Sequence, residues 1–171
     1  MKRIAKFHKV SYEQFEKDWM NEFPHYPIEK VKEIYDAIKL PKRATSGSAG
    51  YDFFMPMDYT FATDTITKIP TGIRVEIDEG WVLKCYPRSS LGTKYMLVPR
   101  NLTPIIDSDY FYSDNEGHIF MKMVNMGNKF VCLKQGDAFL QGIFVEYGIT
   151  VDDEVTEIRN GGFGSTTRNS N

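Results

Sequence analysis

The sequence predicts a mainly β protein with a two-helix extension at its N-terminus. From residue 44 onward, short β-branched and aromatic runs alternate with Gly, Pro, Asp and Asn, a pattern typical of strands and turns. Helical periodicity is absent from that part of the sequence. Before residue 40, apolar residues instead recur every three or four positions, which predicts amphipathic helices.

The first 40 residues predict two helices. Residues 11–14, Ser-Tyr-Glu-Gln, form a capping box, and aromatic residues follow at helical spacing, so we expect a helix over residues 12–23. A second helix is expected from Pro27 to about Lys39, because Pro is favoured in a first helical turn and Pro41 prevents continuation. The aromatic face of these helices should be buried.

The rest of the chain predicts a series of short strands. Residues 66–77 alternate loosely around Pro70-Thr71-Gly72, residues 78–80 form a turn, and residues 81–86 return as a strand. Residues 119–124 and 139–147 extend the series, and this spacing favours a sandwich or jelly roll. The chain is therefore divided into a helical extension (1–40), a β domain (41–155) and a flexible C-terminal arm (156–171).

Composition fits one globular domain without an obvious charged partner. The chain has 171 residues, of which 42% are hydrophobic and 26% charged. With 21 Lys plus Arg against 23 Asp plus Glu, the formal net charge is -2, so neither nucleic acid nor an anionic membrane is an expected partner. No apolar run is long enough to span a bilayer and no signal-peptide pattern follows the basic N-terminus, so a cytoplasmic location is expected.

The sequence lacks the patterns typical of a metal site held by protein side chains. Cys85 and Cys132 are far apart, and His8, His25 and His118 do not have His-x-x-x-His or Glu-x-x-His spacing. We expect both cysteines to be small buried residues and the three histidines to be ordinary surface or strand residues.

Residues 87–92, Pro-Arg-Ser-Ser-Leu-Gly, are a first candidate site. A guanidinium group, two hydroxyls and backbone N–H groups can together bind an anion. The alternative is an ordinary polar turn after a strand, which is the more frequent meaning of an isolated motif of this kind. The adjacent Gly92-Thr93-Lys94 is not a P-loop, because the Gly-Lys-Thr order and the preceding spaced Gly are missing.

Residues 159–166, Arg-Asn-Gly-Gly-Phe-Gly-Ser-Thr, are a second candidate site. Glycines let the backbone approach a ligand closely, Arg, Ser and Thr are phosphate partners, and the ring of Phe163 can stack on a base. The alternative is a disordered C-terminus. A single aromatic residue among glycines argues against that alternative, since a merely solubilising tail has no use for it.

Residues 101–110, Asn-Leu-Thr-Pro-Ile-Ile-Asp-Ser-Asp-Tyr, are the third and most informative candidate. Asp107 follows two isoleucines, where partial exclusion of water suits a general base. The alternative is a turn whose carboxylates cap backbone N–H groups, and from this window alone the two are evenly balanced. A calcium loop is set aside because Tyr112 stands where such a loop requires Gly.

Taken in order, these segments resemble the motifs of the homotrimeric dUTP diphosphatases, or dUTPases. The resemblance runs from about residue 44 to residue 166 and covers five motifs, at residues 49–52, 87–92, 101–110, 136–141 and 159–166. Five motifs in the family's order are highly specific. The resemblance implies a β-clip or jelly-roll barrel, hydrolysis of dUTP to dUMP and pyrophosphate, and a homotrimer in which three subunits build each active site.

The resemblance also implies the roles of individual residues. Asp107 is expected to activate the attacking water, with Asp52 as a further active-site carboxylate. Asn101 is expected to read the uracil edge, Tyr110 to stack beneath the deoxyribose and exclude a ribose 2'-hydroxyl, and Phe163 to cover the uracil. The full set of expected substrate-binding residues is Arg88, Ser89, Ser90, Gly92, Asn101, Ile106, Tyr110, Gln141, Arg159, Phe163, Gly164, Ser165 and Thr166.

Mg²⁺ is the expected cofactor. The negative charges of a triphosphate repel Asp107 unless cations offset them, and Mg²⁺, Arg88 and Arg159 can do so. No cage of side chains for the ion is visible in the sequence. That pattern fits a hard cation held mainly by phosphates and waters.

Three features depart from the family pattern. Residues 113–117 look like an insertion that lengthens the hairpin after Tyr110, Ala138 and Phe139 replace a usual Arg and Ile, and the N-terminal helices lie outside the usual core. Two other functions therefore stay open. One is an enzyme of the dCTP deaminase type, which acts on the base, and the other is a dUTPase-like protein that binds and regulates another protein.

Overall fold

The chain begins with a strand that the sequence analysis did not anticipate. In the computed structural model, which describes residues 1–157 and 159, β1 (Ala5–Lys9) pairs antiparallel with β6 (Ile73–Ile77). The ring of Phe7 meets the buried ring of Phe53 edge to face, with centroids 5.8 Å apart. The segment before the helices is therefore joined to the β core.

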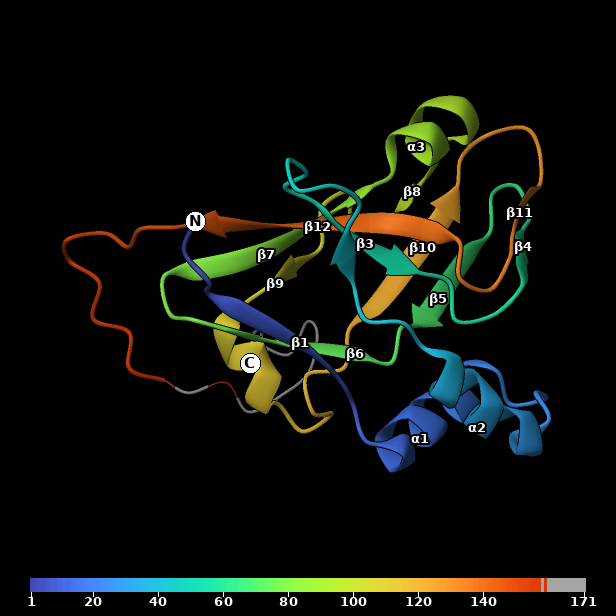
Figure 1. The fold of residues 1–171 in the computed structure, drawn as a ribbon, viewed down its shortest axis with the longest axis horizontal. Coiled ribbons are helices and arrows are strands. Elements are labelled where there is room, and N and C mark those ends of the chain that lie inside the picture. The colour runs from blue at the N-terminus through green and yellow to red at the C-terminus, as the bar shows by residue number, and fades with distance from the viewer. Residues whose placement is uncertain (158, 160–171) are drawn as a thin grey trace, which may run out of the picture.

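The two expected helices are confirmed. α1 (Tyr12–Glu22) starts at Ser11, whose hydroxyl accepts the backbone N–H of Gln14 at 3.1 Å as the capping box predicts. α2 (Ile28–Ala37) starts after Pro27. The helices lie side by side at one end of the strands (Figure 1) and enclose fully buried Phe15 and Trp19 in a small core of their own.

Gly72 lets the helices approach the strands closely. It joins β5 (Ile66–Pro70) to β6 and has a φ of +71°, a conformation that costs a side chain-bearing residue energy. A Cβ atom at this position would lie 2.2 Å from Cδ1 of Ile38 and 3.3 Å from the ring of Phe15. Both the backbone conformation and the space therefore require glycine.

Among the residues that the structure describes, the strands form four sheets, and the mainly β fold class is confirmed. The largest sheet has the order β2 (Lys42–Arg43), β3 (Tyr51–Phe54), β12 (Ala138–Glu146), β7 (Trp81–Pro87) and β9 (Ile105–Ile106). A second has the order β5, β10 (Phe120–Asn125) and β8 (Leu97–Pro99), while β4 (Tyr59–Phe61) pairs with β11 (Val131–Leu133). Within residues 1–157 no sheet closes into a barrel.

Short helices stand at two segments for which the sequence analysis considered a polar turn. α3 (Ser89–Tyr95) follows β7, and a 3-10 helix, η1 (Ser108–Tyr112), follows β9. Two expectations about single residues were wrong: Cys132 is exposed, and His118 is completely buried outside any strand. None of the helices described is long and apolar enough to cross a membrane.

Candidate active site

Strand register gathers one group of predicted site residues, Asp52, Arg88 and Gln141, which we call the sheet half. Gln141 on β12 stands opposite Asp52 on β3 and opposite Tyr86 on β7, so the first two side chains share one face of the sheet. Arg88 follows β7, and its Nε lies 3.4 Å from Oδ1 of Asp52. The Asp52 side chain is mostly covered, whereas that of Arg88 is 42% exposed and available to an anion.

Three more of the predicted site residues lie next to the sheet half. Ser89 and Ser90 are exposed in the first turn of α3, and Gly92 lies one turn further on against Pro87. Gln141 Nε2 donates a hydrogen bond of 3.3 Å to the carbonyl oxygen of Pro87. Hydroxyl, guanidinium and amide donors are thus concentrated at the end of β7.

A second group, Asn101, Asp107 and Tyr110, lies around β9 and η1, and we call it the hairpin half. Ile106 pairs with Leu83 of β7, and its side chain is buried in the core, so only its backbone is offered to a ligand. Asp107 is the residue that precedes η1. Asn101 is exposed in the turn that leads to β9.

Arg159 binds the carboxylates of the hairpin half. Its Nη2 donates to Oδ2 of Asp107 at 2.6 Å, and its Nε donates to Oδ1 of Asp109 at 2.8 Å. The Asp107 side chain is nevertheless 51% exposed. The partial exclusion of water that the sequence led us to expect around Asp107 is therefore not provided by a single chain.

Tyr110 is held firmly beside these exposed carboxylates. Its hydroxyl donates to the carbonyl oxygen of His118 at 2.7 Å and accepts a hydrogen bond from Nδ2 of Asn115 at 2.9 Å. Burial raises the pKa of Tyr110 to about 12, so the phenol stays neutral at physiological pH. A neutral, fixed ring is suited to packing against a ligand.

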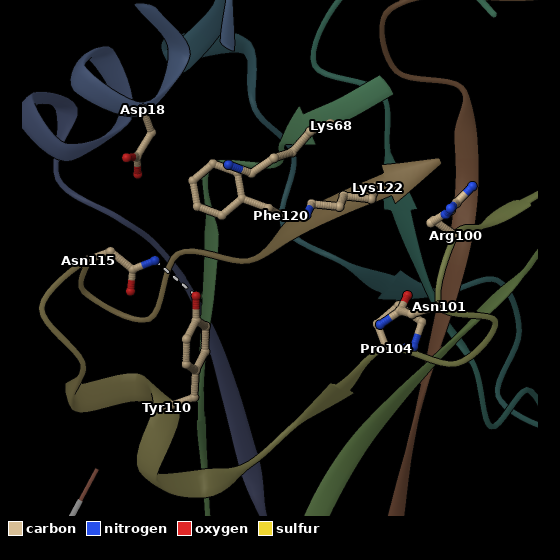
Figure 2. A pocket seen from close by; sticks show the side chains of 9 residues that line it. All are labelled: Asp18, Lys68, Arg100, Asn101, Pro104, Tyr110, Asn115, Phe120 and Lys122. Atoms are coloured by element: carbon tan, nitrogen blue, oxygen red, sulfur yellow. Dashed lines mark hydrogen bonds between the residues drawn. The ribbon is translucent and has the colours of Figure 1, made fainter. Parts of the chain in front are cut away.

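A cavity of about 540 Å³ opens between the hairpin half and the N-terminal helices (Figure 2). Pro104, Tyr110 and Phe120 form its apolar lining. The polar lining consists of Asp18, Lys68, Arg100, Asn101, Asn115 and Lys122. The volume lies within the range of pockets that hold small organic ligands. Asp107 and Arg159 line a second hollow, which shares no lining residue with this cavity.

The sheet half and the hairpin half are far apart within one chain. Asp52 and Asp107 are separated by three strand spacings across the sheet, from β3 through β12 and β7 to β9. Asp52 is level with Tyr86 of β7. Ile106 pairs with Leu83 of β7, and Asp107 lies one residue beyond that pair on the side away from Tyr86. Along the strand direction, Asp52 and Asp107 are therefore four residues apart. Standard strand dimensions place their backbones roughly 20 Å apart.

The predicted residues therefore fall into groups, and some lie outside the structure described. Phe163, Gly164, Ser165 and Thr166 belong to residues 160–171, which are not described. Among residues 1–157 and 159, no three His, Cys, Asp or Glu side chains converge as a metal cage. Sequence reasoning missed Asp18 and Asn115, which line the cavity, and the side chain of His118. Asp18 and His118 are brought together across 100 residues by packing, while Asn115 lies in the apparent insertion and has no motif of its own.

Several solved structures with the same fold are dUTPases. The crystal structure of the dUTPase from Streptococcus mutans matches with a TM-score of 0.63 and 30% sequence identity, covering 84% of this chain and 97% of that one. A dUTPase from phage phi11 of S. aureus, described with a structural Mg(II) ion, matches with a TM-score of 0.63, 17% identity and coverage of 91% and 98%. The chain has the fold of the dUTPases.

Comparison of sequences shows to which family of proteins the chain belongs. The dUTPase family model matches residues 36–167. The deoxyuridine 5'-triphosphate nucleotidohydrolase of Lactococcus lactis is 42% identical over 132 residues, which cover 75% of this chain and 88% of that protein. The chain belongs to the dUTPase family.

Proposed function

We propose that this protein hydrolyses dUTP to dUMP and pyrophosphate. The observation that carries the proposal is the hairpin half, where Asn101 and Tyr110 line one cavity and Asp107 directly precedes the short helix that carries Tyr110. A cavity of this size accepts a base and its sugar. The related enzyme of L. lactis carries the matching activity in its name.

In this proposal Asp107 is the general base. It takes a proton from the water that attacks the α-phosphorus, and the bond from that phosphorus to the oxygen bridging to the β-phosphorus breaks, which releases pyrophosphate. Asn101 reads the uracil, and Tyr110 supports the deoxyribose. Arg159 contacts Asp107 in the free chain, and a triphosphate would offer the guanidinium a more highly charged partner.

The distance between the two halves supports an active site shared between subunits. Asp107 cannot reach a phosphate chain bound at Arg88 when about 20 Å separates the strand positions of the two halves. In a homotrimer, the hairpin half of one subunit can face the sheet half of another. The neighbouring subunit would also cover Asp107, whose side chain is half exposed in the single chain.

Mg²⁺ fits the carboxylate chemistry of both halves. Hard cations prefer oxygen ligands and keep several waters, so an ion held mostly by the triphosphate needs few protein ligands. Asp52, beside Arg88 in the sheet half, is the carboxylate best placed to assist. When bound, the ion would offset phosphate charge. Four residues near the C-terminus are proposed to complete the site: Phe163, Gly164, Ser165 and Thr166. The cytoplasmic location of the protein stays a prediction.

A substrate panel tests the proposal. The purified protein is incubated with dUTP, dCTP or dTTP, with Mg²⁺ or with EDTA, while pyrophosphate and ammonia are followed. We expect pyrophosphate from dUTP only and its loss with EDTA. Ammonia from dCTP would instead identify a deaminase, and the absence of both products would favour a protein-binding role.

A further inference from the structure

The N-terminal helix α1 supplies part of the wall of the cavity that Asn101 and Tyr110 line, which we call the nucleoside cavity. Asp18, on α1, lines this cavity together with Tyr110, although its side chain is only 11% exposed. Oδ2 of Asp18 lies 2.6 Å from Nδ1 of His118 and accepts a hydrogen bond of 2.8 Å from Nε2 of Gln14. The extension is therefore in direct contact with the candidate site (Figure 2).

The hydrogen bonds of His118 fix its protonation. Nε2 of His118 accepts the backbone N–H of Gly72 at 2.8 Å, so this nitrogen carries no proton. The proton of the neutral ring must then be on Nδ1, which donates it to Asp18. The imidazole is completely buried, and it bridges α1 to the turn between β5 and β6.

The backbone of His118 holds Tyr110 in place. Its carbonyl oxygen accepts the hydroxyl of Tyr110 at 2.7 Å, and Asn115 Nδ2 donates to that same hydroxyl at 2.9 Å. A shift of the imidazole would move this carbonyl group and, with it, the anchor of the phenol. A continuous series of contacts thus runs from α1 through Asp18 and His118 to Tyr110.

A second contact ties the insertion to the same helix. Glu116 accepts the backbone N–H of Ser11 at 2.8 Å and the Ser11 hydroxyl at 2.6 Å, at the start of α1. The segment at residues 113–117 and the N-terminal extension, which both lie outside the five motifs, therefore hold each other. Asn115, in this segment, donates to the Tyr110 hydroxyl, and Asp18, in the extension, lines the same cavity as Tyr110.

We propose that Asp18 is a positioning residue for the nucleoside cavity, which through His118 holds Tyr110 in the position that separates deoxyribose from ribose. The inference rests on the proposed function, in which Tyr110 lies against the sugar. Replacing Asp18 by Ala leaves the Nδ1–H of a buried imidazole without its acceptor, and the ring then has to move or lose its other contact. Replacement by Asn keeps an oxygen that can accept the same hydrogen bond.

The test measures kcat/KM for dUTP and for UTP and compares their ratio among variants. We expect Asp18→Ala to lower the ratio about tenfold, Asp18→Asn to stay within about threefold of the unmodified protein, and Glu13→Ala to leave it unchanged. Glu13 is the matched control, because it removes an exposed carboxylate from the same helix. A partly unfolded sample lowers both rates equally and leaves the ratio constant.

Asn115→Ala keeps the inference testable if Asp18→Ala does not fold. It removes the amide that donates to Tyr110 without touching α1, and we expect the dUTP to UTP ratio to fall in the same direction. If the unmodified protein releases pyrophosphate from dUTP normally and the folded variants keep its dUTP to UTP ratio of kcat/KM, the role of Asp18 is overturned. Failure of the unmodified protein to release pyrophosphate would instead overturn the proposed function.

Discussion

The sheet half and the hairpin half are positioned by different means. Asp52 and Gln141 are placed by strand register, and Arg88 follows directly from the end of β7. Tyr110 of the hairpin half is held by hydrogen bonds to the His118 carbonyl oxygen and to Asn115, and the bond from His118 to Asp18 joins residues 100 positions apart. The first arrangement is built into the sheet, while the second depends on α1 and on the insertion.

This difference predicts which half of the site a given substitution affects. Substitutions in the N-terminal helices should alter recognition of the nucleoside and leave the phosphate-binding donors of the sheet half in place. Changes in the sheet should do the reverse.

The largest expected effect separates chemistry from binding within the hairpin half. Asp107→Asn should lower kcat for dUTP about 1,000-fold, because the amide cannot accept the proton of the attacking water, while nucleotide affinity stays within a few-fold. Steady-state kinetics and titration with a non-hydrolysable dUTP analogue measure the two quantities. Asp109→Asn, which alters the other partner of Arg159, is the control and should retain most of the activity.

Mixing two inactive variants tests whether the halves of different chains meet. Arg88→Ala damages only the sheet half, and Asp107→Asn damages only the hairpin half. When both variants are co-expressed in equal amounts and assemble at random, each half of a shared site is intact in about one half of cases. Both halves are then intact in about one quarter of the sites, so activity should return to about one quarter of that of the unmodified protein. A mixture no more active than either variant alone would show that each chain uses its own two halves.

A smaller effect probes how the helices dock beside the hairpin half. Gly72→Ala introduces both strain at a φ of +71° and a clash with Ile38, and it should cost about 3 kcal/mol of unfolding free energy. Gly80→Ala is the matched control, since its φ is +83° but no atom lies within 4 Å of the new Cβ, and it should cost about 1 kcal/mol. Equal losses in urea denaturation would contradict the close packing at Gly72.

The smallest expected effect is a pH dependence of stability that comes from His118. Burial lowers the pKa of His118 below its usual 6.5. The contribution of the neutral imidazole to the unfolding free energy is therefore present above pH 6.5 and is lost as the pH falls below that value. Asp18, Lys68 and Glu116 face the imidazole from α1, β5 and the insertion. The pKa values of Asp18 and Glu116 lie below their usual 3.8 and 4.5, so both carboxylates stay charged between pH 5 and 7.

Denaturation measured from pH 7 to pH 5 checks this prediction. The unfolding free energy of the unmodified protein should decrease across the interval, whereas His118→Gln should lack this part of the slope. The same slope in both proteins would assign the effect to other groups.

Local signals in the sequence predicted much of the fold and the membership of the family. The capping box at Ser11 placed α1, and alternating strands and turns placed the principal strands. The wall of the cavity could not be predicted in this way. Asp18 looks like any polar residue of an amphipathic helix, and His118 belongs to no spacing motif, because their pairing is decided by how α1 packs against the turn at Gly72.

The pair of Asp18 and His118 has a consequence for the order in which the protein forms during synthesis. α1 and α2 leave the ribosome early and can pack on each other through Phe15, Trp19 and Val31. The imidazole that joins them to the hairpin emerges 100 residues later. The nucleoside cavity therefore cannot be assembled until the chain has been made as far as Lys122, and a nascent chain displays its helices long before it can recognise a nucleotide.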